Sequence, residues 1–141
     1  MVQVDFETAA AFLKEQEGFV LLCHAFPDGD TIGSAAALCE GLRQLGKRAY
    51  IRCPHDIPKK FAPLTEGFLS CDFPEETVVA VDVADRKLLG HLDEIYGERV
   101  DLCVDHHPSN TGYAKRLCLN ADAAANCENI FHLLQALGVR M

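Results

Sequence analysis

Hydrophobic residues along the chain follow two alternating patterns. Apolar positions spaced three to four residues apart are typical of helices with one buried face, and short apolar runs rich in β-branched residues are typical of buried strands. The first pattern predicts helices over residues 5–16, 30–45, 86–96 and 121–137, and the second predicts strands over 19–23, 49–53, 77–81, 99–104 and 114–119. Strands that alternate with helices favour an α/β fold, a doubly wound, mostly parallel sheet with helices on both faces.

Two of these segments give more detail. The run Thr77–Val81 is strongly β-branched, which predicts a central parallel strand. Residues 54–70 contain three prolines and a glycine, so we expect a loop there with one helical turn near residues 59–64. The expected inward-facing helix residues are Ile32, Ala35, Ala36 and Cys39 in the second helix and Ile130, Leu133, Leu134 and Leu137 in the last.

Composition narrows the class of protein. The 141 residues suit one domain, and 49% hydrophobic residues suffice for one core. A formal net charge of −8 argues against a broad nucleic-acid patch, and no apolar run is long enough to span a bilayer, so no membrane partner is expected. The seven cysteines include no Cys-x-x-Cys pair, which disfavours a zinc knuckle and favours reduced core thiols in a cytoplasmic protein.

Metal-binding side chains follow three of the predicted strands. They are His24, Asp28 and Asp30 after the first strand, Asp82 after the third, and Asp105, His106 and His107 after the fourth. In a parallel sheet these strand ends share one edge, which is where open α/β sheets bind ligands. Mixed carboxylate and imidazole groups suit Mn²⁺ best, with Mg²⁺, Fe²⁺ or Co²⁺ as alternatives, and suit Zn²⁺ less well.

Each group also has a simpler interpretation. Asp28 and Asp30 alone are typical turn and helix N-cap residues, Asp82 alone would cap the next turn, and two adjacent histidines are usually surface residues. A shared metal site is favoured because the simpler explanation must otherwise hold independently at three strand ends. The remaining histidines lack such neighbours and are expected to be surface or helix residues, namely His55, His91 and His132.

The same residues resemble the first three motifs of the DHH phosphoesterase family. The motifs are His24-x-x-x-Asp28-x-Asp30-x-x-Gly33-Ser34, Val81-Asp82-x-x-Asp85 and Val104-Asp105-His106-His107-Pro108-x-Asn110. Within the family, the third motif and the short loop between the first two resemble the nano-RNase branch, which degrades very short oligoribonucleotides and dephosphorylates 3′-phosphoadenosine 5′-phosphate. Ala124–Glu128 resembles that branch's Ala-Ser-Thr-x-Glu helix start, with Asn126 and Cys127 as departures.

The resemblance implies a role for each site residue. His24 and Asp28 would hold one Mn²⁺, Asp30 and His106 would hold a second, and Asp82 would bridge both. His107 would contact the scissile phosphate, and Asp105 would orient the histidine pair from behind. A hydroxide bridging the two ions would then attack phosphorus in a two-metal mechanism. The expected partners are short oligoribonucleotides or small nucleotide phosphates, and a homodimer stays open.

Two family features have no counterpart in residues 1–141. One is a fourth-motif aspartate in a Gly-Ile-x-x-Asp-Thr context, which completes the second metal site. The other is a C-terminal substrate-binding domain with a glycine-rich motif. We therefore expect residues 1–141 to be the metal-binding half of the DHH catalytic domain, weakly active or inactive by itself.

The sequence is also compatible with other functions. Within the family, the alternatives are a cyclic-dinucleotide phosphodiesterase, an exopolyphosphatase and a pyrophosphatase. A different class of protein would be a non-catalytic module that binds a nucleotide or a metal.

Overall fold

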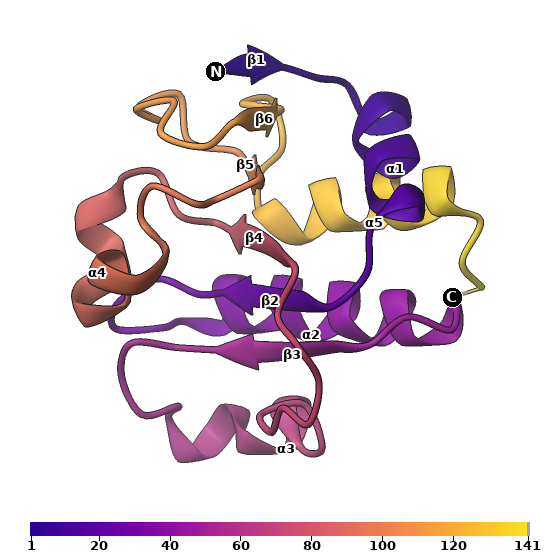
Figure 1. The fold of residues 1–141 in the computed structure, drawn as a ribbon. Coiled ribbons are helices and arrows are strands. Elements are labelled where there is room, and N and C mark those ends of the chain that lie inside the picture. The colour runs from indigo at the N-terminus through magenta and orange to yellow at the C-terminus, as the bar shows by residue number, and fades with distance from the viewer. Residues whose placement is uncertain (141) are drawn as a thin grey trace.

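A six-stranded parallel sheet forms the centre of the molecule, as seen in a computed structural model that describes residues 1–140 (Figure 1). Its strands are β1 (Val2–Gln3), β2 (Phe19–Leu22), β3 (Ala49–Arg52), β4 (Thr77–Val81), β5 (Leu102–Asp105) and β6 (Arg116–Leu119). They are arranged in the order β1-β6-β5-β4-β2-β3, and all neighbours are parallel. The doubly wound α/β prediction is confirmed, and β4 lies inside the sheet as expected.

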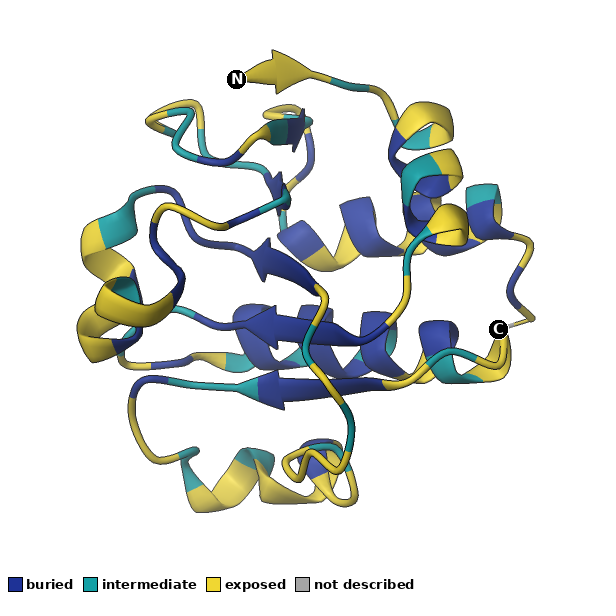
Figure 2. Ribbon diagram, viewed as in Figure 1, coloured by how far each residue is buried: buried dark blue, intermediate teal, exposed yellow. Residues whose placement is uncertain are grey.

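Helices cover both faces of this sheet. The helices α1 (Phe6–Glu15), α2 (Gly29–Gln44) and α5 (Asn126–Leu137) pack on one face, and η2 (Arg86–Leu92) and α4 (Asp93–Tyr96) pack on the other. Strand residues alternate between the two cores: Phe19 and Leu21 face α1, α2 and α5, whereas Val20 and Leu22 face η2 and α4. Figure 2 shows β2 and β4 buried along their length, as expected for strands covered on both faces.

A short helical segment lies beyond the edge strand β3, as the sequence predicts. It consists of η1 (Lys59–Phe61) and α3 (Ala62–Thr65), and α3 contacts α2. No helix among the described residues has both the length and the apolar character needed to cross a bilayer.

The order of the strands creates a crevice between β2 and β4. The chain leaves β2 to form β3 on one side and then returns to form β4 on the other side of β2. Two loops therefore diverge at the carboxyl ends of β2 and β4, which is the usual ligand site of such sheets. The loop after β2 begins at Cys23, and the loop after β4 begins at Asp82.

Two predicted elements begin or break differently in the structure. The strand predicted over residues 99–104 starts at Leu102, because the N–H of Val78 donates to the carboxylate of Asp101 and not to a backbone carbonyl. Asp105 is the last residue of the strand and does not follow it. The helix predicted over 86–96 is interrupted at Gly90, whose φ of 54° and ψ of −134° are not helical. The segment therefore forms the short 3₁₀ helix η2, which bends at Gly90, followed by the single turn of α4.

The final helix and the first strand also depart from the sequence pattern. The helix predicted from residue 121 begins at Asn126, because residues 120–124 form turns in which Asn120 accepts bonds from Asp122 and Ala123. The two-residue strand β1 was not predicted, since it is too short and too exposed to show a pattern. The eight helix residues predicted to face inward are all buried, which confirms those faces.

The packing of α5 leads to a stability prediction. Leu133 is fully buried against the sheet, and Phe131 on the same helix is 47% exposed. We expect Leu133→Ala to lower the free energy of unfolding by about 2–5 kcal/mol through lost burial and a cavity. Phe131→Ala should change it by less than about 0.5 kcal/mol, as is usual for surface positions. Urea unfolding of both variants tests this, and equal losses would mean that α5 does not carry the core.

Candidate metal centre

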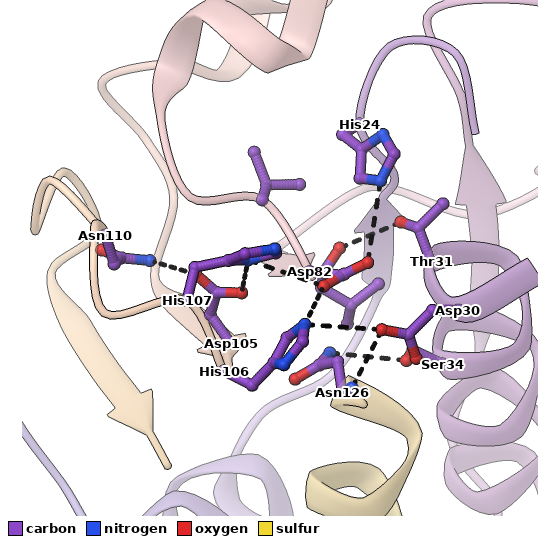
Figure 3. Close-up of polar contacts among 12 residues, drawn as sticks. His24, Asp30, Thr31, Ser34, Asp82, Asp105, His106, His107, Asn110 and Asn126 are labelled. Carbon is purple, nitrogen blue, oxygen red and sulfur yellow. Dashed lines mark hydrogen bonds and ion pairs between the residues drawn. The ribbon is translucent and has the colours of Figure 1, made fainter. Parts of the chain in front are cut away.

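The centre of the site is the carboxylate of Asp82, which directly follows β4. Asp82 is 2% exposed and has a φ of 61°, a left-handed conformation that aspartate adopts more readily than most residues. Its Oδ2 lies 3.6 Å from the Nε2 of His24, and its Oδ1 lies 3.2 Å from the Nε2 of His106 (Figure 3). One carboxylate oxygen thus faces each of two histidines that come from different strand ends.

Both histidines are held by their other ring nitrogen. The Nδ1 of His24 donates to the carbonyl of Ala25 at 2.7 Å, and the Nδ1 of His106 donates to the carbonyl of Ala123 at 3.3 Å. Each Nε2 is therefore the nitrogen left to face Asp82. Histidines that bind metals show this arrangement, in which the second nitrogen is fixed by a carbonyl or carboxylate.

Asp28 caps the helix that follows the first loop. Its Oδ1 accepts a hydrogen bond from the backbone N–H of Thr31 at 2.9 Å and lies 3.8 Å from the Nε2 of His24. The simpler N-cap interpretation is therefore correct for Asp28, but it does not exclude metal binding. The carboxylate still lies beside His24, and 63% of the side chain is exposed.

Asp30 also contacts two parts of the structure, the start of α5 and His106. Its two oxygens accept the backbone N–H groups of Asn126 at 2.9 Å and Cys127 at 3.0 Å, which are the first residues of α5. This carboxylate supplies the cap that the N-cap residue Ala125 lacks. Its Oδ2 also lies 3.6 Å from the Nε2 of His106, so Asp30 connects the start of α5 to the histidine.

His107 is oriented by Asp105 and Asn110. The Nδ1 of His107 donates to the Oδ1 of Asp105 at 2.7 Å, and the Nδ2 of Asn110 donates to the Oδ2 of the same carboxylate at 2.8 Å. With both of its oxygens bound, the buried Asp105 fixes the ring and leaves the Nε2 of His107 as the nitrogen available to a ligand. The side chain of His107 is 40% exposed, which suits a group that meets a substrate.

The pKa shifts at the site follow from burial and from these contacts. The neighbouring Asp82 carboxylate raises the pKa of His24 to about 9, against an opposing effect of burial. Burial raises the pKa of Asp82, and the contact with His24 partly offsets this increase. A positive charge close to Asp82 is therefore what stabilises this carboxylate in the interior.

The residues present fit a divalent cation. Within residues 1–140, the Oδ1 of Asp82 is shielded from solvent and accepts no hydrogen bond, although the Nε2 of His106 is close to it. Buried polar atoms are rarely left without a partner, so an electron-pair acceptor is missing at this point. Two groups of residues each offer ligand atoms within 4.8 Å of one another. The first group is His24, Asp28 and Asp82, and the second is Asp82, Asp105, His106 and His107. Asp82 belongs to both groups.

All seven residues selected from the sequence lie in this connected cluster. The expected convergence on one edge of the sheet is therefore observed, while the metal-binding and phosphate-binding roles stay predictions. Asp30 lies outside both ligand groups but reaches His106. His55, His91 and His132 are exposed, as expected. The seven cysteines are free thiols.

Two buried amides in α5 have structural roles that the sequence did not predict. Asn126 donates through its Nδ2 to the Oγ of Ser34 at 3.4 Å, and Asn129 donates to the backbone carbonyl of Asp105 at 3.1 Å. Both belong to the buried face that continues with Ile130. Their spacing of three residues on an apolar face was the available signal, because polar groups there need partners.

Small residues of α2 explain the Gly33-Ser34 pair of the first motif. A Cβ on Gly33 would lie 3.3 Å from the Sγ of Cys127, so glycine allows α5 to approach α2 closely. Ser34 is fully buried, and its Oγ accepts the bond from Asn126. Both residues therefore keep the start of α5 next to Asp30.

The capping role of Asp30 can be tested separately from metal binding. Asp30→Ala and Asp30→Asn both remove the charge that repels Asp82, but asparagine keeps one acceptor for α5. We expect Asp30→Ala to be less stable than Asp30→Asn by about 1 kcal/mol, the usual contribution of a cap. Urea unfolding in EDTA measures this difference. The exposed Asp122 provides a matched pair, for which the alanine and asparagine variants should be alike within about 0.5 kcal/mol.

Curated proteins similar in sequence to this chain are known. The curated relatives include the bifunctional oligoribonuclease and PAP phosphatase NrnA of Thermus thermophilus, 30% identical over 135 residues that cover 92% of this chain and 40% of the relative. The uncharacterized protein MG371 of Mycoplasma genitalium is 25% identical over 136 residues, which cover 92% of this chain and 41% of that protein. The chain thus spans about two fifths of the length of these relatives.

Solved structures share the fold. An exopolyphosphatase-related protein from Bacteroides fragilis superposes with a TM-score of 0.83 at 19% identity, covering 94% of this chain and 44% of that one. The exonuclease RecJ bound to manganese gives a TM-score of 0.61 at 19% identity, covering 97% and 38%. The model of the DHH family N-terminal domain matches residues 19–141, so the chain belongs to the DHH family.

Proposed function

We propose that the complete gene product is a Mn²⁺-dependent phosphoesterase acting on short oligoribonucleotides and on 3′-phosphoadenosine 5′-phosphate. The substrate class is supported by the 30% identity to a bifunctional oligoribonuclease and PAP phosphatase. The observation that carries the proposal is the buried Oδ1 of Asp82, which has no hydrogen-bond donor and lies among histidines directed at it. A cation is the partner that this arrangement lacks.

In this proposal Asp82 bridges two ions. His24 and Asp28 would hold the first, and Asp30 and His106 would hold the second, since a different oxygen of Asp82 faces each histidine. Carboxylate and imidazole donors suit Mn²⁺, the ion bound in the RecJ exonuclease that shares this fold. Bound ions would supply Lewis acidity toward the phosphate and a nucleophile at neutral pH.

The remaining residues would position the substrate. As an imidazolium, His107 would donate from its Nε2 to a phosphate oxygen while its Nδ1–H donates to Asp105, which holds the ring in place. Asn110 keeps Asp105 from rotating, because it binds the other carboxylate oxygen. A ring fixed in this way loses little freedom on binding, so its contact is preorganised for the transition state.

The bridging role of Asp82 predicts unequal effects on metal binding. Asp82→Asn keeps the shape and tolerates the positive φ, and Asp28→Asn keeps the cap on α2. Losing a group that only supports a metal ligand costs about 10- to 100-fold in affinity, so a direct ligand should cost at least about 10-fold. We expect Mn²⁺ affinity to fall about 10-fold in Asp28→Asn and at least about 100-fold in Asp82→Asn, since Asp82 would contact two ions. Calorimetric titration with Mn²⁺ tests this, and equal losses would make Asp82 an ordinary ligand.

His107 should affect turnover and not metal uptake. In the complete gene product we expect His107→Ala to lower kcat by about 100-fold, the usual effect of losing one preorganised donor. Mn²⁺ affinity should change less than twofold. His91→Ala is the control, since His91 is an exposed histidine on η2. Loss of Mn²⁺ binding in His107→Ala would exchange the roles of His106 and His107.

The proposal itself is tested by a Mn²⁺-supplemented assay of the complete gene product. Hydrolysis of 3′-phosphoadenosine 5′-phosphate and of diribonucleotides, lost in Asp82→Asn, is the expected result. Binding of these compounds without turnover would instead indicate a nucleotide-binding module. Residues 1–141 alone should show little or no activity, and full turnover by them would show that the residues described here suffice.

A further inference from the structure

An aromatic pair lies beside the metal centre, outside the residues assigned so far. The rings of Phe26 and His55 stack with centroids 4.6 Å apart and an interplanar angle of 17°. The backbone N–H of Phe26 also donates to the Nδ1 of His55 at 3.3 Å, which fixes the histidine against the loop. Phe26 is nevertheless 81% exposed.

The loop that carries Phe26 is held on both sides. The N–H of Ala25 donates to the carbonyl of Leu88, and Gly29 lies so close to the ring of Phe61 that a Cβ there would approach it to 3.3 Å. Phe26 has a φ of 55°, which is an outlier for a bulky residue. Such strain persists only where the surroundings impose it, and it is common at binding sites.

The position of Phe26 relates it to the proposed substrate. It stands between His24 and Asp28, two residues from each, so its Cα lies within about 7 Å of theirs even in an extended chain. His55 also lines an open groove of about 1140 Å³, together with Cys53, Asp56 and Lys59. A space of this size accommodates a nucleoside, and it begins at the histidine that stacks on Phe26.

We infer that the Phe26–His55 pair is a stacking platform for a nucleobase of the substrate. This inference rests on the proposed function and adds a base-binding subsite to it. One face of the Phe26 ring is covered by His55, and the exposure of the side chain leaves the rest open to a planar ligand. Stacking on an aromatic residue accepts any base, which suits an enzyme for short oligoribonucleotides of mixed sequence.

The test compares substrates with and without a base. In the complete gene product, Phe26→Leu keeps an apolar side chain but removes the aromatic face. We expect it to raise KM for a diribonucleotide by about 5- to 150-fold, the range for one base stack. KM for the same compound with an abasic ribose should not change, and Phe26→Trp should keep affinity for the normal substrate. His55→Ala should give a smaller loss with the same dependence on the base.

Two controls separate this platform from general damage. Phe131→Leu removes another exposed aromatic residue that lies beside a histidine, on the outer face of α5, and should leave KM unchanged. Mn²⁺ affinity of Phe26→Leu should equal that of the unaltered protein. An equal rise in KM for the abasic substrate would overturn the inference, because Phe26 would then only support the loop. An unchanged KM for both substrates would also overturn it.

A binding measurement distinguishes failure of the platform from failure of the proposed function. With Mn²⁺ present, the unaltered protein should bind adenosine 5′-monophosphate more tightly than ribose 5-phosphate, and Phe26→Leu should abolish this difference. If no phosphoester is hydrolysed but the difference appears, the proposed function fails and the platform stands. If hydrolysis occurs and both compounds bind equally, the platform fails and the proposed function stands.

Discussion

The structure of the site depends on the burial of one negative charge at the crevice between β2 and β4. The carboxylate of Asp82 is 2% exposed, and moving an unpaired carboxylate into a protein interior is strongly unfavourable. The surrounding residues compensate for this in part, since His24 and His106 approach from two other strand ends. Their Nδ1 atoms are bound to carbonyls, so each ring can turn only its Nε2 toward Asp82. A divalent cation would complete the compensation, which is the reason for proposing a metal site here and not a purely structural ion pair.

Asp30 connects this charge balance to the packing of α5. Its carboxylate caps α5 while lying beside His106, so the first turn of the last helix and the second proposed ion would share one group. A metal that drew Asp30 away from Asn126 and Cys127 would weaken the cap on α5. By linkage, a change that strengthens this cap would lower the affinity for that metal. The buried amides Asn126 and Asn129 keep the helix start against Ser34 and Asp105, which limits how far Asp30 can move. The candidate metal centre is therefore joined to the core through α5.

The sequence predicts most of the fold and the identity of the cluster, for a physical reason. Strands such as Thr77–Val81 have a local apolar pattern, and parallel pairing then brings their carboxyl ends together whatever the loops do. The cap of α5 by Asp30 could not be predicted, because it joins residues 96 positions apart. The start of that helix was misplaced for another reason: Ala121–Ala125 has helical propensity, but its backbone groups bond to His106 and to the side chain of Asn120. The platform of Phe26 and His55 depends on a backbone conformation that no sequence pattern indicates.

Net charge gives a further argument for small substrates. With a formal net charge of −8, the chain cannot gain affinity for long RNA from counterion release along a basic surface. Within this chain, affinity would then come from a few strong local contacts, and the structure offers two kinds. A cation at Asp82 would attract one phosphate, and an exposed aromatic ring at Phe26 would take one base. Together these two contacts would hold the phosphate and the base of one nucleotide.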